Sequence, residues 1–271
     1  MEWVDFAVVG SLPAPGAIVH ATEHFAEPAG GGGVAAVNLV RMAGAAPFLT
    51  AVGDDPLGAR AARELREHGV ALHAAPRAGV PQRRAITHLS EDDHERTITV
   101  VGERIVPHRD DPLPWEDVAA WGGCYFTGGD VGALRAARAA GVLVATPRAR
   151  GTLEAAGVEL DVLVASASDP GERPEGLPAR LVVLTRGAEG GEWRAADGTS
   201  GTWPAAPLPG PPVDSYGCGD TFAAALTLAL AAGERLDAAL GFAARAGAAV
   251  LTGRGPYGAP LPALRAATAG G

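Results

Sequence analysis

The sequence predicts a doubly wound α/β domain, and three features of the chain carry that prediction. Short apolar runs alternate with helical patterns along most of the 271 residues, which is typical of a parallel sheet with helices on both faces. Hydrophobic residues make up 47% of the chain and charged residues only 20%, so a sizeable core can form and disorder is excluded. A hairpin pattern near residue 90 interrupts the alternation, and we interpret it as a small added lid.

Glycine and capping residues mark where the helices begin and end. Gly30–Gly33 opens an apolar stretch that stops at Gly44, so we expect a helix entered from a glycine-rich loop. Asp55 followed by Pro56 supplies a capping carboxylate and a first-turn proline, which favour a helix start. The opening run Val4–Val9 reads as a buried strand. The other elements expected from these patterns are strands at 48–52, 124–127, 142–145, 162–164 and 181–184, and helices at 56–68, 131–140, 218–232, 236–252 and 261–267.

The hairpin is the one clear departure from the strand–helix rhythm. Arg84–Leu89 and Arg96–Val101 both alternate apolar and polar residues, and a polar turn at 91–93 separates them. We see no internal repeat, so we expect one domain over residues 1–271. Its lid is predicted to consist of about residues 12–29 and 81–107.

Composition and charge exclude several function classes. All 22 basic residues are arginine, which removes the lysine that a P-loop or a Schiff base needs. The net charge of −9 argues against a nucleic-acid partner. The chain shows no signal peptide and no long apolar span, so we expect no membrane partner and a cytoplasmic location. Cys124 and Cys218 are too isolated for a disulfide framework or metal site, and we expect buried, reduced thiols.

The segment around Asp214–Thr221 carries the chemistry. Gly217, Cys218 and Gly219 precede an alanine-rich helix, so successive backbone N–H groups can converge there into an anion hole strengthened by the helix dipole. The carboxylate of Asp220 at the edge of this hole is well placed to take a proton from an attacking hydroxyl. The alternative, that Asp220 only caps the helix, stays open from the residues alone.

This segment resembles the signature of the ribokinase-like, PfkB-type carbohydrate kinases, Asp-Thr-x-Gly-Ala-Gly-Asp, with cysteine in place of the alanine. Three other blocks, earlier in the chain, also occur in the family's order, so the resemblance covers nearly the whole chain. The matching residues are Asp214, Ser215, Gly217, Gly219 and Asp220, together with the blocks Gly30–Gly33, Gly53–Gly58 and Thr185–Gly190. The resemblance implies a ribokinase-like α/β fold, with a mostly parallel sheet, helices on both faces and a small β-hairpin lid.

The resemblance also implies a function. The family transfers the γ-phosphoryl group of ATP to an alcohol, here a small sugar, sugar acid or nucleoside, and needs Mg²⁺ to neutralise the β- and γ-oxygens. Asp220 matches the catalytic base, and the N–H groups of Gly217, Cys218 and Gly219 match the anion hole. The nucleotide-binding candidates are Thr185, Gly187, Gly190 and Asp214. The lid often serves as a dimer surface in the family, so a homodimer is expected through it.

Several positions depart from the family pattern on the acceptor and metal side. No carboxylate stands near Pro15, Ala35 replaces an asparagine, and Gly32 stands where a ribokinase has lysine. The Asp-x-Asn-x-Arg block keeps only Arg150, with Arg148 in place of asparagine. The Asn-x-x-Glu block aligns with residues 166–169, where Asp169 is left as a candidate for a metal-bound water.

Six residues are the candidates for binding the phosphoryl acceptor. They are Gly31, Gly32, Arg84, Arg96, Asp130 and Arg150. Arginines that point into the site, with Arg104 and Arg148 among them, would favour an anionic acceptor; solvated surface arginines are the alternative. Asp130 either binds a hydroxyl at a strand end or caps the next helix.

Two rival functions follow from these departures. The altered blocks favour a ligand-binding protein on the kinase fold with weak or no catalysis, whereas the intact Asp220 favours a kinase. A pyrimidine-alcohol kinase of the same superfamily fits less well, because those enzymes usually lack the lid hairpin.

Overall fold

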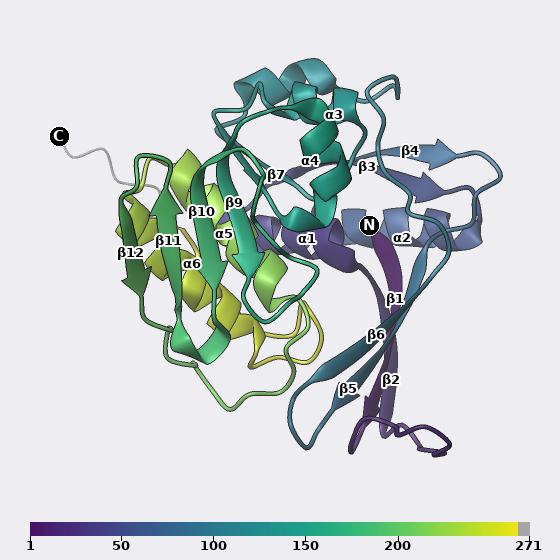
Figure 1. Cartoon of the computed structure of the whole chain (residues 1–271). Coiled ribbons are helices and arrows are strands. Elements are labelled where there is room, and N and C mark those ends of the chain that lie inside the picture. The colour runs from purple at the N-terminus through teal and green to yellow at the C-terminus, as the bar shows by residue number, and fades with distance from the viewer. Residues whose placement is uncertain (265–271) are drawn as a thin grey trace.

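The computed structural model describes residues 1–264, and it consists of a layered α/β body from which a second sheet projects (Figure 1). The strands are β1 (Glu2–Val9), β2 (Glu23–Ala29), β3 (Pro47–Gly53), β4 (Ala71–Arg77), β5 (Arg84–Ser90), β6 (Arg96–Val101), β7 (Gly123–Phe126), β8 (Val142–Ala145), β9 (Leu160–Ser166), β10 (Ala179–Thr185), β11 (Gly191–Ala195) and β12 (Ser200–Trp203). The helices are α1 (Gly30–Ala43), α2 (Pro56–Glu67), α3 (Val131–Ala137), α4 (Arg150–Ala156), α5 (Cys218–Ala231) and α6 (Leu236–Val250), with short 3-10 helices η1 (Trp115–Ala120), η2 (Pro147–Ala149) and η3 (Gly187–Glu189).

The body is built around a six-stranded sheet in the order β12-β11-β10-β9-β8-β7. The strands from β7 to β10 are parallel, and β11 and β12 extend one edge in antiparallel fashion. Side chains of this sheet alternate between its faces: Val144 and Val162 pack with α5 and α6, whereas Leu143 and Leu163 pack with α3 and α4. Both faces are covered, which confirms the predicted doubly wound class.

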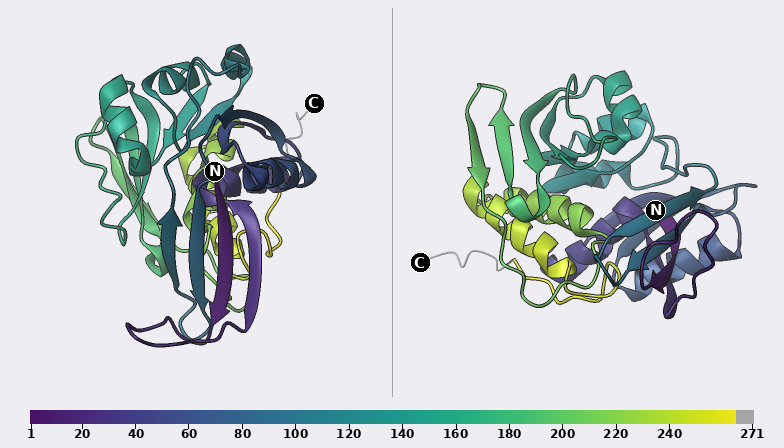
Figure 2. Two further views of the ribbon diagram at one scale, coloured as in Figure 1. Left: turned by 90° about the vertical axis from the view of Figure 1, so that its right-hand side faces the viewer. Right: turned by 60° about the horizontal axis from the view of Figure 1, so that its bottom comes forward.

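The second sheet, which we call the projecting sheet, has the order β2-β1-β5-β6. Figure 2 shows its strands extending away from the helical body. The expected hairpin is present as β5 and β6. The opening run Val4–Val9, which we expected to form a buried strand, is part of β1 and lies in this sheet between β2 and β5. Val4, Phe6 and Val8 on β1 form the buried side of the projecting sheet with Tyr216, so the sheet is anchored on the loop before α5.

The helix boundaries follow the local signals in the sequence. Gly44 ends α1 in the left-handed conformation (φ 83°), where glycine carries no steric penalty. The Asp55 side chain caps α2 by accepting from the Gly58 N–H at 2.7 Å. A separate parallel pair, β3 and β4, packs with α1 and α2.

The last predicted helix, 261–267, is not present in the part that the structure describes, because residues 261–264 are irregular and 265–267 lie outside the described residues. Both cysteines are free, and burial raises the pKa of each thiol to about 12. Within residues 1–264, no helix has both the length and the apolar character needed to cross a membrane.

Candidate active site

The amino end of α5 is open to a ligand. Gly217 precedes the helix in the left-handed conformation (φ 86°), and no side chain caps the helix there. The first N–H groups of a helix have no partner within it, so those of Cys218 and Gly219 remain free. Gly219 is exposed and has nothing within 4 Å of a Cβ position. The arrangement can therefore bind an anion through backbone N–H groups and the helix dipole.

Asp220 stands in the first turn of α5 and is held by a neighbouring strand rather than by its own helix. Its Oδ1 accepts a hydrogen bond from the Tyr125 hydroxyl on β7, at 3.3 Å. No backbone N–H of the described residues donates to this carboxylate, so the alternative that Asp220 merely caps α5 finds no support. Burial, followed by the nearby Glu172 charge, raises the pKa of Asp220 to about 6. A carboxylate tuned in this way can exchange a proton near neutral pH.

The start of α1 packs directly against Asp220. A Cβ atom added at Gly31 would lie 2.7 Å from Asp220 Oδ1, and one added at Gly32 would lie 3.0 Å from Thr127 Oγ1. These two positions must therefore be small. The structure brings Gly31 to Asp220, because the amino ends of α1 and α5 face each other here, and it places Gly32 beside Thr127.

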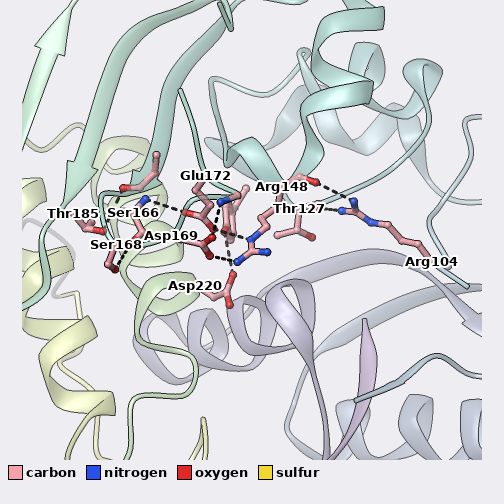
Figure 3. Close-up of polar contacts among 12 residues, drawn as sticks. Arg104, Thr127, Arg148, Ser166, Ser168, Asp169, Glu172, Thr185 and Asp220 are labelled. Carbon is pink, nitrogen blue, oxygen red and sulfur yellow. Dashed lines mark hydrogen bonds and ion pairs between the residues drawn. The ribbon is translucent and has the colours of Figure 1, made fainter. Parts of the chain in front are cut away.

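Glu172, which the sequence motifs did not single out, is the acidic side chain that faces Asp220. Its Oε2 accepts from the Ser166 N–H at 2.9 Å, and its Oε1 accepts from Arg148 Nε at 3.0 Å. The same guanidinium also pairs with Asp169 (Figure 3). Burial lowers the pKa of Arg148, but the surrounding carboxylates outweigh it and raise that pKa above its ordinary value. The glutamate of the family's Asn-x-x-Glu block thus has a counterpart in Glu172, three residues beyond Asp169.

The site offers carboxylates for a nucleotide-bound metal but no self-sufficient metal centre. No group of three or more acidic, histidine or cysteine side chains within residues 1–264 is arranged to hold an ion. Magnesium bound with a nucleotide needs only one or two carboxylates, because water and phosphate complete its octahedral shell. Glu172 and Asp169 lie together beside Asp220 and meet this requirement.

The four nucleotide-binding candidates fall into two groups. Thr185 ends β10 opposite Ser166, and Gly187 follows in an exposed turn. Gly190 is buried, and a Cβ there would lie 2.1 Å from the Trp203 carbonyl oxygen, so packing against β12 accounts for it. Asp214 is fully buried, and its oxygens accept from the N–H groups of Tyr216 (3.0 Å) and Gly255 (2.8 Å). This placement contradicts nucleotide contact by Asp214, whose carboxylate instead shapes the loop before α5.

The predicted acceptor residues divide in the same way. Arg96 reaches the site, where Nη1 donates to Ser215 Oγ at 2.8 Å; beside it, the His94 ring contacts the Val213 carbonyl oxygen at 3.2 Å. Arg84 instead pairs with Asp5 at 2.8 Å on the opposite face of the projecting sheet.

Two further acceptor candidates serve the fold. Arg150 is occupied by Glu154 at 2.8 Å and by the Glu175 carbonyl oxygen at 3.2 Å. Asp130 Oδ1 caps α3 by accepting from the Ala133 N–H at 2.7 Å. Both contacts are local and give these side chains a structural role; their assignment to the acceptor stays a prediction.

Comparisons with known proteins agree with this geometry. Residues 7–140 and 135–264 match the pfkB family carbohydrate kinases. No curated protein matches the chain. Among solved structures, a provisionally assigned ribokinase from Agrobacterium tumefaciens has a TM-score of 0.78 at 25% identity, covering 96% of this chain and 92% of that one.

Two other solved structures share the fold at lower identity. The Arabidopsis thaliana ribokinase complexed with ribose and ATP has a TM-score of 0.72 at 20% identity, with coverage of 97% and 93% of the two chains. The adenosine kinase from Sinorhizobium meliloti has a TM-score of 0.71 at 19% identity, with coverage of 99% and 95%. The sequence match spans nearly all of the described residues, and the protein belongs to the pfkB family of carbohydrate kinases.

Proposed function

We propose that the protein transfers the γ-phosphoryl group of ATP to a hydroxyl of a small sugar, sugar acid or nucleoside, with Asp220 as the general base. The observation that carries this proposal is the pairing of Asp220 with an uncapped helix end: a proton acceptor stands one residue from N–H groups that are free to bind phosphate oxygens. A protein that only binds ligands has no physical need for a carboxylate at that position.

In the proposed reaction, the acceptor hydroxyl lies against Asp220, and its proton passes to the carboxylate as its oxygen bonds to the γ-phosphorus. The bond from the γ-phosphorus to the bridging oxygen of the β-phosphate breaks, and ADP leaves with that electron pair. The N–H groups of Cys218 and Gly219 stabilise charge on the transferring group. These N–H groups also provide a lysine-free chain with part of the positive potential that phosphoryl transfer requires.

ATP is proposed to lie along the carboxyl edge of the six-stranded sheet, from Thr185 and Gly187 towards the amino end of α5. The solved Arabidopsis ribokinase holds ribose and ATP, and its likeness in fold supports the use of ATP here. Magnesium, when bound with the nucleotide, neutralises charge on the β- and γ-oxygens. Glu172 and Asp169 would hold it, which requires Arg148 to release at least one of them.

The projecting sheet is proposed to act as the lid of this single-domain kinase, with residues 12–29 and 81–107 contributing beside β1. Its outer surface exposes Ile86 and Val101, which are 41% and 49% exposed. We propose that a homodimer forms through this surface, which light scattering of the purified protein would test.

The test of the proposed function is phosphoryl transfer by Asp220→Asn. With Mg²⁺ and ATP, wild-type protein should release ADP in the presence of at least one member of a sugar, sugar-acid and nucleoside panel. Asp220→Asn should lose about 10³-fold in kcat while binding ATP with unchanged affinity in calorimetry. Asp237→Asn, on the exposed surface of α6, is the matched control. Wild-type turnover in Asp220→Asn would refute the base, and ATP binding without transfer to any acceptor would support the ligand-binding alternative.

A further inference from the structure

Arg104 is held in one orientation at the carboxyl ends of the parallel strands. Its Nη2 donates to the Thr127 carbonyl oxygen after β7, and its Nη1 donates to the Arg148 carbonyl oxygen after β8, both at 2.9 Å. Gly128 leaves room for the guanidinium, because a Cβ there would lie 3.0 Å from Nη2. A guanidinium has five N–H groups, so the remaining donors of this fixed group stay available.

Short contacts connect Arg104 to the proposed base. Thr127, whose carbonyl binds Arg104, directs Oγ1 towards Gly32; the neighbouring Gly31 touches Asp220. Figure 3 shows Arg104 and Asp220 at the two ends of this arrangement, on either side of Thr127. A small acceptor with its hydroxyl at Asp220 would extend along Thr127 towards the Arg104 guanidinium.

The charge of Arg104 is not balanced by a neighbour. Arg83 pairs with Glu2 at 2.8 Å, and Arg148 pairs with Glu172 and Asp169. No carboxylate among residues 1–264 lies within ion-pair distance of Arg104.

The surroundings of Arg104 reinforce that imbalance. Arg104 is an exposed residue, but partial burial of its guanidinium lowers its pKa. The positive charges of Arg83 and Arg148 lower that pKa further, and the Glu2 charge raises it. A bound anion would relieve this repulsion, and a guanidinium in fixed orientation suits bidentate contact with carboxylate or phosphate.

The same region has few hydrogen-bond acceptors that would bind the hydroxyls of a neutral polyol. Sugar hydroxyls donate hydrogen bonds to carboxylate and amide oxygens, and Oδ1 of Asp130 is already used in capping α3. Residues 11–15 contain no carboxylate. The acceptor side therefore presents a fixed cation where an ordinary sugar site would present acceptor oxygens.

We propose that the phosphoryl acceptor carries an anionic group, a carboxylate or a phosphate, which Arg104 binds at the end of the acceptor remote from the reacting hydroxyl. This proposal rests on the proposed function for the position of that hydroxyl at Asp220. Arg104 thereby determines specificity, and the chain is a kinase of acidic or already phosphorylated small molecules rather than of free sugars.

The first experiment compares acceptors that share a carbon skeleton: D-ribose, D-ribonate and D-ribose 5-phosphate, and likewise D-glucose, D-gluconate and D-glucose 6-phosphate. ADP release is measured for wild type, Arg104→Gln and Arg104→Lys, with Arg66→Gln on the remote helix α2 as the matched control. In wild type, kcat/KM should be at least tenfold higher for an anionic member than for its neutral partner. Arg104→Gln should bring that ratio to within about threefold, Arg104→Lys should restore part of it, and Arg66→Gln should leave it unchanged.

A carboxylate preference and a phosphate preference are separated by the ribonate and ribose 5-phosphate arms, and either supports the proposal. A higher kcat/KM for the neutral partner, or an anion preference that survives in Arg104→Gln, would overturn it. Thermal unfolding of Arg104→Gln checks that any loss is not a loss of fold.

A second measurement separates this proposal from the proposed function. Calorimetry is performed with protein saturated with a non-hydrolysable ATP analogue and Mg²⁺, so that the nucleotide phosphate site is filled. In one outcome, no acceptor is phosphorylated, but an anionic compound of the panel binds to wild type and binds at least tenfold more weakly to Arg104→Gln. That outcome would support the anion site and refute the kinase function. If no anionic member binds to wild type, the anion site is refuted whatever the turnover.

Discussion

The Tyr125 hydroxyl donates to Asp220 Oδ1 across 3.3 Å, and this contact differentiates the two oxygens of the proposed base. Oδ1 is also the atom against which the start of α1 packs, at Gly31. Oδ2 is left to accept the proton. In the proposed reaction, Tyr125 is therefore a positioning residue that fixes which oxygen of Asp220 faces the acceptor.

Tyr125→Phe should shift the pH dependence of phosphoryl transfer. Burial raises the pKa of Asp220 to about 6 even though the hydrogen bond from Tyr125 lowers it. Removal of this hydrogen bond raises that pKa, so the acidic limb of kcat/KM moves to higher pH and kcat falls several-fold. A pH profile from 5 to 8 measures this, with Tyr257→Phe, whose hydroxyl bonds to the Pro28 carbonyl, as control. An unmoved acidic limb would show that Tyr125 is only a packing residue.

Glu172→Gln should shift the same limb in the opposite direction. The Glu172 charge raises the pKa of Asp220, so its neutralisation lowers that pKa and extends activity to lower pH. The variant should also need about tenfold more Mg²⁺ for half-maximal rate, since one of two carboxylates near the phosphates is lost. Titration with Mg²⁺ at fixed ATP measures the second effect. A larger change in Asp169→Asn than in Glu172→Gln would show that Asp169, rather than Glu172, is the main metal-binding carboxylate.

Alanine at two glycines should separate phosphate binding from placement of the base. Gly219→Ala meets open space and keeps the fold stable, but its methyl group would project from the proposed phosphate site and raise KM for ATP about tenfold. Gly31→Ala places Cβ 2.7 Å from Asp220 Oδ1 and should lower kcat while ATP affinity is kept. Steady-state kinetics and ATP calorimetry on both variants decide the matter. Equal effects on KM and kcat in both would contradict the assignment.

Glu27→Gln should stabilise the protein at pH 8 and change little at pH 5. Burial raises the pKa of Glu27 to about 7 from 4.5, and among the described residues its buried Oε2 has no hydrogen-bond partner. The folded state thus holds a proton that the unfolded state has released, and wild-type stability declines as pH rises from 4.5 through 7. The gain at pH 8 should be about 1–3 kcal/mol, measured by urea unfolding at both pH values. A pH-independent change would show that Glu27 ionises freely.

Local signals allowed much of the fold to be predicted, whereas strand pairing was not visible in the sequence. Gly44 and Asp55 end and begin helices through contacts within one turn, which a short window contains. The strand β2 has glutamate, histidine and proline among its residues and is held by pairing with β1. That pairing, and the membership of β1 in the projecting sheet, depend on residues far apart in sequence.

The candidate site shows the same division. Asp220 and its glycines are close in sequence and were predicted from the motif. Glu172 was missed because it lies beyond the spacing of the Asn-x-x-Glu block, which ends at Asp169. The chain turns back at Pro170-Gly171, so the Glu172 carboxylate still reaches the Ser166 N–H. That proline–glycine pair was a turn signal that could have located it.

Strand parity could have separated the two hairpin arginines. Arg96 is paired with Leu89, whose side chain is buried, so both point inward; Arg84 precedes buried Ala85 and therefore points outward. Composition and net charge alone do not show on which face of a strand a side chain lies; the alternation of side chains along the strand does.

The contacts of Arg96 with Ser215 and of His94 with the Val213 carbonyl join the tip of the projecting sheet to the loop before α5. Two such hydrogen bonds contribute about 2 kcal/mol in all, which corresponds to a few per cent of molecules unlatched at any moment. These two contacts are weak enough for small molecules to enter and leave the site quickly. In the proposed kinase, these contacts would also couple opening of the proposed lid to the proposed phosphate-binding loop, so that entry of the acceptor and readiness of the nucleotide site would change together.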